Sequence, residues 1–248
     1  MELGEEQLER YSRHIVIKEI GIKGQKKLFN SKVLIIGAGG LGSPAALYLA
    51  AAGTGTLGIA DPDIVELSNL QRQIMHTTES IGKPKAESAK RAVTAINPGI
   101  NVNIHKVFAD KDNIKEIIKD YDFIIDATDN FASKFLINDI CVKEGKAFSH
   151  AGVVRFQGQL FTYVPGAPCY RCFFKEPPPE GVVKNGSEAG IIGAVCGITG
   201  SLQAMEAVKY ITGTGKLLTG KFLIFDSLTM QFRTVKFKKD KDCKICSV

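Results

Sequence analysis

The chain has 248 residues, of which 44% are hydrophobic and 8% aromatic, a composition typical of a globular protein with a buried core. Its 32 basic and 26 acidic residues give a net charge of +6, and part of this excess lies in the run at 236–241. So mild an excess, without an aromatic and basic module beside it, argues against nucleic-acid binding.

Residues 33–60 carry no charged side chain, so a membrane span has to be considered. Seven glycines and a proline interrupt that stretch, whereas a spanning helix needs about 20 largely apolar residues in a row. The N-terminus is acidic, unlike a signal peptide. We therefore expect a cytoplasmic protein without a membrane segment, whose six cysteines stay reduced unless a metal holds them.

Two short helices, near 5–14 and 22–29, are expected to form an N-terminal arm. Strands and helices then alternate, which predicts an α/β fold: a Rossmann-like parallel sheet with helices on both faces. The expected strands lie near 32–37, 56–61, 101–107, 121–126 and 146–151. The expected helices lie near 42–53, 83–96, 111–119 and 131–144.

The C-terminal part has a different texture. Strands near 159–164, 221–225 and 231–237 are expected to extend the sheet with antiparallel pairing, and a loop near 165–188 and a helix near 197–212 separate the first from the second. We expect one domain with three parts: an arm at 1–30, a nucleotide-binding core at 31–155 and a sheet extension at 156–248.

A glycine-rich turn follows the first strand of the core and opens a helix. Its glycines are Gly37, Gly39, Gly40 and Gly42. Glycines let the backbone approach a phosphate, and the helix start offers free N–H groups to the anion. Asp61 ends the second strand, where a carboxylate can bond ribose hydroxyls. The turn alone does not choose between NAD, FAD and ATP, and a turn that only packs a helix is the plainer alternative.

Further polar residues favour ATP. The stretch after Asp61 contains the amides of Asn69 and Gln73 and the guanidinium of Arg72. Lys85 lies further on, at a helix start. Arginine and lysine suit a triphosphate, where they offset charge during nucleotidyl transfer. If Arg72 or Lys85 occurred alone, a solvated surface charge would be the simpler interpretation.

Asp129 and Asn130 follow the fourth core strand, at the sheet edge where open α/β sheets bind ligands. Asp129 can hold Mg²⁺ between phosphates, although a helix cap is the simpler explanation for it alone. The joint occurrence of these residues in this order indicates an ATP site.

Four cysteines form two knuckles about 70 residues apart: Cys169, Cys172, Cys243 and Cys246. Paired knuckles suit a tetrahedral Zn²⁺ with four thiolates, which leaves no open position for catalysis. Free thiols or disulfides are the alternative.

These motifs resemble the MoeB/ThiF/HesA family, adenylyltransferases that activate ubiquitin-like sulfur carriers. The resemblance covers almost the whole chain, at 10–14, 37–42, 61–72, 82–85, 126–130, 158–159, 169–172, 188–190 and 200–204. It implies that the C-terminal glycine carboxylate of a carrier ending in Gly-Gly attacks the α-phosphate of Mg-ATP. The products are a carrier acyl-adenylate and pyrophosphate. It also implies a structural zinc at the knuckles.

The resemblance assigns roles to single residues. Asp61 binds the ribose, and the phosphates are held by Asn69, Arg72 and Lys85. Asp129 organises Mg²⁺ and is essential. Arg13 reaches into the nucleotide site of a partner subunit, which implies a homodimer; without the resemblance, Arg13 is equally well a solvated helix charge.

Several family features are missing. Relatives carry a reactive cysteine in the loop before the Glu-Ala-Gly segment, but residues 184–190 contain none. Cys141 and Cys196 lie in apolar patterns and are expected in the core. We therefore expect an enzyme that stops at the adenylate. The loop at 181–190 fits a segment that closes over the carrier's tail, or an inert loop. Longer relatives append a sulfurtransferase domain, so we expect a separate sulfur donor.

Two other functions stay open. The glycine turn also suits an NAD(P)-dependent oxidoreductase, although none of the four histidines lies in a recognisable proton relay. A non-catalytic scaffold is the other possibility. The pathway is equally open among molybdopterin, thiamine, thiolated-tRNA and cysteine biosynthesis.

Overall fold

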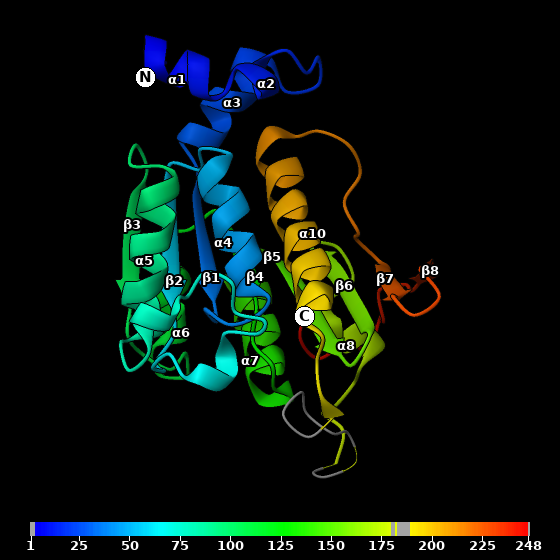
Figure 1. Ribbon diagram of the computed structural model, residues 1–248. Helices are drawn as coiled ribbons and strands as arrows, with labels where there is room; N and C mark the ends of the chain where they lie inside the picture. The colour runs from blue at the N-terminus through cyan, green and yellow to red at the C-terminus, as the bar shows by residue number, and fades with distance from the viewer. Residues whose placement is uncertain (1–2, 180–181, 183–188, 248) are drawn as a thin grey trace.

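A computed structural model describes residues 3–179, 182 and 189–247, and its centre is one eight-stranded sheet (Figure 1). The strands are β1 (Lys32–Ile36), β2 (Thr56–Ala60), β3 (Asn101–His105), β4 (Phe123–Asp126), β5 (Ala147–Val154), β6 (Gln157–Tyr163), β7 (Lys221–Asp226) and β8 (Gln231–Lys236). Their order is β3-β2-β1-β4-β5-β6-β7-β8. The first five pair in parallel and the pairs from β5 to β8 are antiparallel, as predicted.

The helices also follow the predicted order. They are α1 (Glu5–Arg10), α2 (Ser12–Ile15), α3 (Gly21–Phe29), α4 (Gly42–Ala51), α5 (Lys85–Ile96), α6 (Ile114–Ile118), α7 (Phe131–Lys143), α8 (Tyr170–Phe173) and α10 (Gly193–Thr212). Two 3-10 turns, η1 (Leu67–Asn69) and η2 (Thr78–Ser80), precede α5. Among the described residues, no helix combines the length and apolar character needed to cross a membrane.

Two helix predictions need correction. The short helix α8 lies inside the segment predicted as a loop at 165–188, and α10 begins at Gly193 rather than near residue 197. A Cβ atom on Gly193 would lie 2.4 Å from the Gln71 carbonyl oxygen. The glycine therefore lets the first turn of α10 approach the backbone beside Arg72, a contact that local sequence does not reveal.

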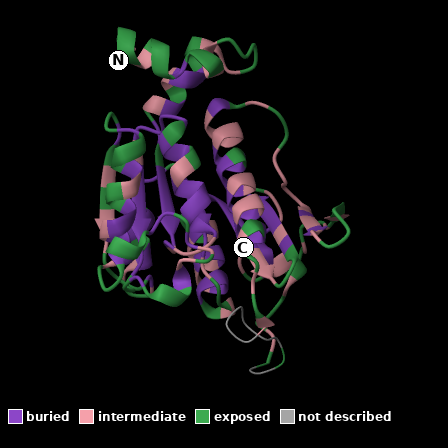
Figure 2. Cartoon of the chain, viewed as in Figure 1, coloured by how far each residue is buried: buried purple, intermediate pink, exposed green. Residues whose placement is uncertain are grey.

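The sheet separates two hydrophobic cores. Along β1, Val33 and Ile35 point to the core under α4, α5 and α10, whereas Leu34 and Ile36 point to the core under α6, α7 and α8. All four side chains are buried, and Figure 2 shows buried residues along the central strands and the helix faces toward them. Burial on both faces explains why β1 reads as a continuous apolar run.

The N-terminal arm is anchored to the core. Tyr11 is buried, and the Asn97 side chain donates a hydrogen bond to its hydroxyl at 2.8 Å. Gln25 is also buried and donates to the Ala52 carbonyl at 2.9 Å. The arm packs at the end of the sheet where β1 begins, so it lies opposite the carboxyl ends of the parallel strands (Figure 1).

Candidate active site

A ligand crevice is expected between β1 and β4, where the order in which the chain adds strands to the sheet reverses. β1 and β4 are neighbours, and the chain leaves them toward opposite edges, which opens a ligand crevice beyond their carboxyl ends. A cavity of about 540 Å³ lies there. Nine predicted site residues line it: Gly37, Gly39, Gly40, Asp61, Arg72, Gln73, Lys85, Asp129 and Asn130. Gly42, Asn69 and Arg13 are not among the lining residues.

The glycine turn can adopt its shape only because Gly37 and Gly42 have no Cβ atom. Gly37 has φ +101, and a Cβ atom there would lie 2.7 Å from the Ala127 carbonyl oxygen. Its N–H donates to the Ala60 carbonyl at 2.8 Å. Gly42 opens α4, and a Cβ there would collide with the Gly37 oxygen at 1.9 Å. Gly42 therefore closes the turn from behind instead of lining the cavity.

Two buried side chains hold the peptide groups of Ala38, in the middle of this turn. Asp61 Oδ2 accepts the Ala38 N–H at 2.7 Å, and Oδ1 accepts the Asp63 N–H at 2.9 Å. On the other side, His76 Nε2 lies 2.9 Å from the Ala38 oxygen, and its Nδ1 lies 2.9 Å from Ser88 Oγ. Each carboxylate oxygen of Asp61 keeps a lone pair for a ribose hydroxyl. The role of His76 escaped the sequence reading, because only the fold brings it under the turn.

Two cationic side chains, Arg72 and Lys85, line the cavity. Arg72 Nη1 donates to the Ser68 carbonyl at 3.1 Å, which holds the guanidinium against the chain. Lys85 begins α5 and is mostly buried, and its ammonium pairs with Asp63 Oδ2 at 2.8 Å. Arg72 and Lys85 thus bring two cationic side chains to a cavity that the glycine turn also lines, and such groups are suited to an anionic ligand.

Asn69 and Gln73 have different positions. Asn69 is buried in η1, where its Oδ1 accepts the Glu66 N–H at 3.1 Å. Its backbone oxygen accepts the N–H groups of Arg72 and Gln73, so Asn69 shapes the turn that presents both. Gln73 is 4% exposed, and its Oε1 has no hydrogen-bond partner in the described part of the chain. A buried amide oxygen at a cavity wall is suited to receive a ligand donor.

Asp129 and Asn130 follow β4 and both are exposed. The helix cap that was the simpler explanation for Asp129 belongs to its neighbour, because Asn130 Oδ1 accepts the Ser133 N–H at 2.8 Å and caps α7. Asp129 lies just before this cap, at the mouth of the crevice. Its carboxylate is a suitable ligand for a cation.

A charged cluster behind the crevice was missed by the sequence analysis. Asp126 is fully buried; its Oδ1 accepts the Thr128 N–H at 3.0 Å and the Thr128 hydroxyl at 2.6 Å. Its Oδ2 lies 2.7 Å from His150 Nδ1 and 3.5 Å from Lys134 Nζ, which also donates to the Ala151 carbonyl at 2.5 Å. The signal was present: β4 and β5 were both predicted, and parallel pairing sets Asp126 beside His150.

Burial controls the charges in this cluster. Burial, together with the nearby Lys134 ammonium, lowers the pKa of His150 to about 4, so the imidazole is neutral near pH 7. Although burial opposes it, the contacts with Lys134 and His150 hold the pKa of Asp126 below its usual range. The cluster is therefore an Asp126–Lys134 ion pair with a neutral imidazole beside it.

The two remaining cysteines are buried, as predicted. Cys141 belongs to the core under α7. Cys196, in the first turn of α10, also lines the cavity, and its Sγ would lie only 2.9 Å from a Cβ atom on Gly40. Burial raises the pKa of Cys196 to about 11, which keeps it a thiol and a poor nucleophile.

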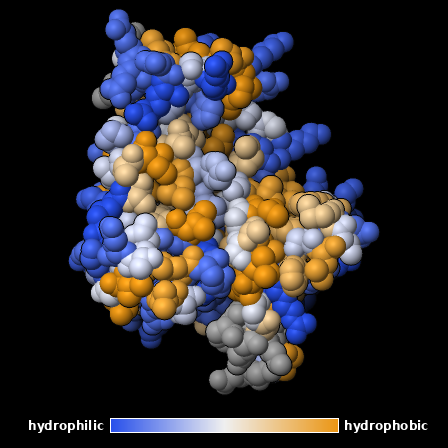
Figure 3. All heavy atoms as spheres, in the orientation of Figure 1, coloured by the Kyte–Doolittle hydropathy of each residue, from blue (hydrophilic) through white to orange (hydrophobic). Residues whose placement is uncertain are grey.

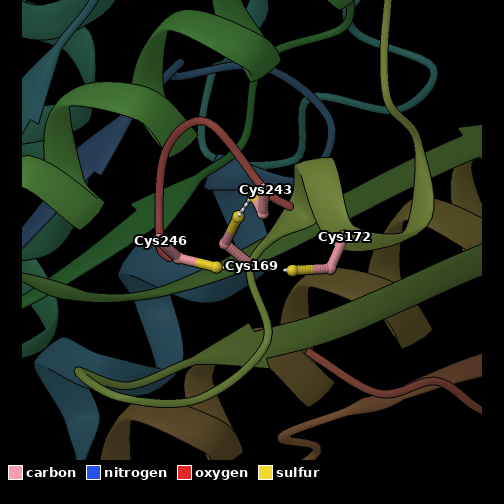
Figure 4. A group of neighbouring side chains, drawn as sticks. All are labelled: Cys169, Cys172, Cys243 and Cys246. Carbon is pink, nitrogen blue, oxygen red and sulfur yellow. Dashed lines mark hydrogen bonds between the residues drawn. The ribbon is translucent and has the colours of Figure 1, made fainter. Parts of the chain in front are cut away.

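The four knuckle cysteines converge, as Figure 4 shows. All four Sγ atoms lie within 4.8 Å of one another, at 3.6 Å for Cys169–Cys243 and 3.4 Å for Cys172–Cys246. A disulfide needs about 2.05 Å, whereas Zn–S bonds of about 2.3 Å set tetrahedral sulfurs about 3.8 Å apart. Burial also raises the pKa of Cys172 to about 11, so a cation is needed to keep it a thiolate. The residues therefore fit a structural zinc.

The loop proposed to close over a carrier tail is mostly undescribed. Of residues 181–190, the structure describes 182, 189 and 190, so most of the stretch that lacks the family's reactive cysteine lies outside the described residues. Gly190 accepts the Arg155 N–H at 2.8 Å, which ties the end of this loop to the turn between β5 and β6.

The fold and sequence both have known counterparts. The structure superposes on E. coli MccB with MccA-N7isoASN with a TM-score of 0.87 at 24% identity, over 97% of this chain and 75% of that one. It superposes on PaaA with a TM-score of 0.80 at 29% identity, over 95% and 75%. The first likeness shows the fold alone.

Closer relatives come from sequence. The SAMP-activating enzyme E1 of Haloferax volcanii is 44% identical over 240 residues, which cover 97% of this chain and 89% of that enzyme. The probable adenylyltransferase/sulfurtransferase MoeZ of Mycobacterium tuberculosis is 45% identical over 96% of this chain. Adenylyltransferase and sulfurtransferase MOCS3 of Aedes aegypti is 44% identical over 99%. This chain spans only 62% of MoeZ and 56% of MOCS3.

A family model agrees with these similarities. The model of the ThiF family matches residues 11–246, from the N-terminal arm to the second cysteine knuckle. The resemblance drawn from the glycine turn, the polar site residues and the knuckles is thereby confirmed. The chain belongs to the ThiF family.

Proposed function

We propose that this protein is an adenylyltransferase that activates the C-terminal glycine of a ubiquitin-like sulfur carrier. The observation that carries the proposal is one cavity lined by the glycine turn, by Arg72 and Lys85, and by Asp129. Its relatives in sequence include an activating enzyme E1 and adenylyltransferases, which supports this reaction class. The oxidoreductase alternative gains no such support.

Different residues of the cavity are proposed to bind different parts of ATP. The backbone of the glycine turn at Gly37, Gly39 and Gly40 faces the phosphates, and Asp61 bonds the ribose. Arg72 and Lys85 offset the charge that develops on the leaving pyrophosphate, and Gln73 contributes its amide. Mg²⁺ held by Asp129 would neutralise the phosphates further. Asn69 acts by holding Arg72 and Gln73 in place.

The other half of the cavity suits a protein tail. Gly152, Gln157 and Gly158 on β5 and β6 and Ile224 on β7 line it. An extended segment ending in two glycines fits a narrow path over these strands. The terminal carboxylate is ionised near neutral pH, so it can attack the α-phosphorus without a general base. Positioning and charge neutralisation are then the main sources of catalysis.

The active form is proposed to be a homodimer with shared sites. Arg13 is exposed on α2, at the end of the sheet opposite its own cavity (Figure 1). A second subunit is therefore needed if Arg13 is to contact ATP. Apolar side chains gather over α4 and α10 (Figure 3), where Tyr48 and Met205 are exposed, and this face suits a subunit interface.

The remaining roles follow from the cysteines and from the sequence. Zinc at the four knuckle cysteines would tie the C-terminal segment to α8 as a structural ion. Every cysteine is either in this cluster or buried, which supports an enzyme that stops at the adenylate and takes sulfur from a separate donor. We propose a cytoplasmic location, where such thiols stay reduced.

ATP–pyrophosphate exchange tests the proposal. Exchange should appear only with a carrier ending in Gly-Gly, and Asp129→Ala should abolish it. Asp120→Ala removes an exposed carboxylate at the other end of β4 and should retain exchange. Exchange that survives in Asp129→Ala would refute the role of Asp129. Tight NADH binding without ATP binding would refute the reaction class.

A further inference from the structure

An aromatic residue links the cysteine cluster to the crevice. Tyr170 directly follows Cys169 and is 1% exposed. Its N–H donates to Asn138 Oδ1 on α7 at 2.8 Å, and its ring centroid lies 4.1 Å from that of His150. Phe161 packs on both rings, at 5.9 Å from Tyr170 and 5.6 Å from His150. The imidazole is therefore packed between aromatic rings from α8 and β6.

His150 passes this constraint to Asp126. Its Nδ1 lies 2.7 Å from Asp126 Oδ2, a close contact whose angles are not those of a hydrogen bond, while the other carboxylate oxygen accepts both the N–H and the hydroxyl of Thr128. Thr128 and His150 therefore contact the two oxygens of one buried carboxylate, at the start of the turn after β4. The next residue in that turn is Asp129.

Stability alone does not explain this arrangement. Burying a carboxylate and an ammonium costs desolvation energy that apolar side chains of similar volume would avoid. The cluster nevertheless lies at the carboxyl end of β4, and both Lys134 and His150 line the cavity. A rigid polar network directly behind a catalytic turn is how enzymes hold reactive groups in place.

We propose that His150 and Tyr170 are positioning residues for the adenylation reaction. Tyr170 holds the imidazole, His150 holds the Asp126 carboxylate, and Asp126 fixes the turn that presents Asp129 to the metal–nucleotide complex. This inference rests on the proposed function, in which Asp129 organises Mg²⁺. It adds residues from β5 and α8 that do not themselves touch ATP in the proposed mechanism.

Two substitutions at His150 test the first link. His150→Ala removes the contact with Asp126, whereas the amide nitrogen of Asn in His150→Asn can take the place of Nδ1. In carrier-dependent exchange at saturating ATP, His150→Ala should lower kcat by about ten- to a hundredfold, the usual loss when a supporting partner of a metal ligand is removed. It should also raise the Mg²⁺ concentration for half-maximal rate. His150→Asn should recover most of both losses.

Hydrogen exchange gives a readout that does not depend on activity. The Thr128 N–H is protected by Asp126, so the peptide covering 126–130 should exchange faster in His150→Ala than in the wild type. Phe148→Leu is the matched control, since Phe148 packs in the same aromatic cluster but is paired in register with Ile124, whereas His150 is paired with Asp126. It should lower thermal stability while leaving the 126–130 peptide and the Mg²⁺ requirement unchanged.

Tyr170 tests the second link in the same way. Tyr170→Leu removes the ring that packs against His150 and should reproduce the His150→Ala behaviour in weaker form. Tyr170→Phe keeps the ring and should behave as the wild type. The inference is overturned if His150→Ala keeps kcat and Mg²⁺ dependence within twofold of wild type. It is overturned equally if Phe148→Leu shifts the Mg²⁺ requirement as far, or if Asn at position 150 restores nothing.

The experiments distinguish the proposed role of Asp129 from the positioning roles of His150 and Tyr170. If Asp129→Ala retains exchange, the proposed role of Asp129 is wrong. If Asp129→Ala abolishes exchange while the His150 and Tyr170 variants leave the 126–130 turn protected, the proposed function stands and the positioning inference alone is wrong.

Discussion

At the scale of single residues, the site depends on backbone positions where the identity of the residue is tightly constrained. Gly37 combines a positive φ with a carbonyl oxygen where its Cβ would be. Ala38, its neighbour, has both peptide groups held by buried side chains. These constraints fix the curve of the turn before any ligand arrives, which lowers the entropy cost of binding phosphate.

We predict that Gly37→Ala weakens ATP binding by at least about tenfold, which corresponds to about 1.4 kcal/mol. The new Cβ forces the turn away from Ala127, and the left-handed backbone adds about 1–2 kcal/mol of strain. Gly145→Ala carries only the strain, since its φ is +64 and nothing lies near its Cβ position. Calorimetric titration with ATP should therefore separate the two variants. Equal affinities would mean that the turn does not hold phosphate.

The buried imidazole predicts a pH effect on stability. The pKa of His150 is about 4 in the folded protein and about 6.5 in the unfolded chain. Below pH 6.5 the unfolded state therefore binds the proton and the folded state does not, so acid favours unfolding. Between pH 6.5 and 5 this histidine should remove about 2 kcal/mol from the free energy of unfolding.

Urea denaturation of wild type and His150→Asn at pH 7 and pH 5 measures this effect. The variant should lose less stability on acidification, by about 2 kcal/mol. Burial also lowers the pKa values of His76 and His105, and these residues titrate in both proteins. An equal loss in wild type and variant would show that His150 is already protonated in the fold.

At the scale of elements, strand order decides what meets at the site. The first and fourth strands are parallel neighbours because the chain runs from β1 through β2 to the edge at β3 and then returns to the other side of β1, and this juxtaposes Gly37 with Ala127. Alternating strand and helix patterns were sufficient to predict this sheet, because each element has a clear hydrophobic period. The motifs within this pattern supplied twelve candidate site residues, and nine of them line the cavity.

Contacts between distant elements were harder to predict. Asp126 and His150 each read as an unremarkable polar residue near a strand end, and only the parallel register joins them. The start of α10 was misplaced because its first turn depends on contact with Gln71 rather than on local propensity. The cap of α7 at Asn130 shifted by one residue from the position weighed at Asp129. Such details are set by tertiary packing, which local propensity does not encode.

The segment after β8 provides a test at the level of elements. Its cysteines meet those of α8, so Cys246→Ser should release the metal and lower the melting temperature, by about 2–4 °C for each kcal/mol lost. Purified wild type should contain one zinc per chain by elemental analysis. Cys141→Ala empties a buried thiol site elsewhere and should keep the zinc. Full zinc content in Cys246→Ser would contradict the assignment.

At the scale of the whole molecule, the proposed catalytic residues lie at two opposite ends of the sheet. The crevice lies at the carboxyl ends of the parallel strands, and Arg13 lies at the opposite end on an arm anchored by Tyr11. A chain that holds its arm so firmly away from its own crevice can use Arg13 in catalysis only through another subunit.

Complementation tests this sharing. Arg13→Ala and Asp129→Ala should each be inactive alone, but a mixed dimer contains one site with both residues intact. After subunit exchange, an equal mixture should recover about a quarter of wild-type activity, because half of the dimers are mixed and each has one complete site. Two Asp129→Ala subunits cannot form such a site, so that protein alone serves as the control. No recovery despite verified subunit exchange would place Arg13 outside the site.

The central claim is that this crevice joins an adenylyl group to the terminal carboxylate of a protein tail. Intact-mass spectrometry of a Gly-Gly carrier, incubated with the enzyme and Mg-ATP, measures that product directly. The account predicts a carrier heavier by one adenylyl group, formed by the wild type and absent with Asp129→Ala or with a carrier whose C-terminus is amidated. ATP binding without any adenylated carrier, across all candidate Gly-Gly carriers, would contradict it.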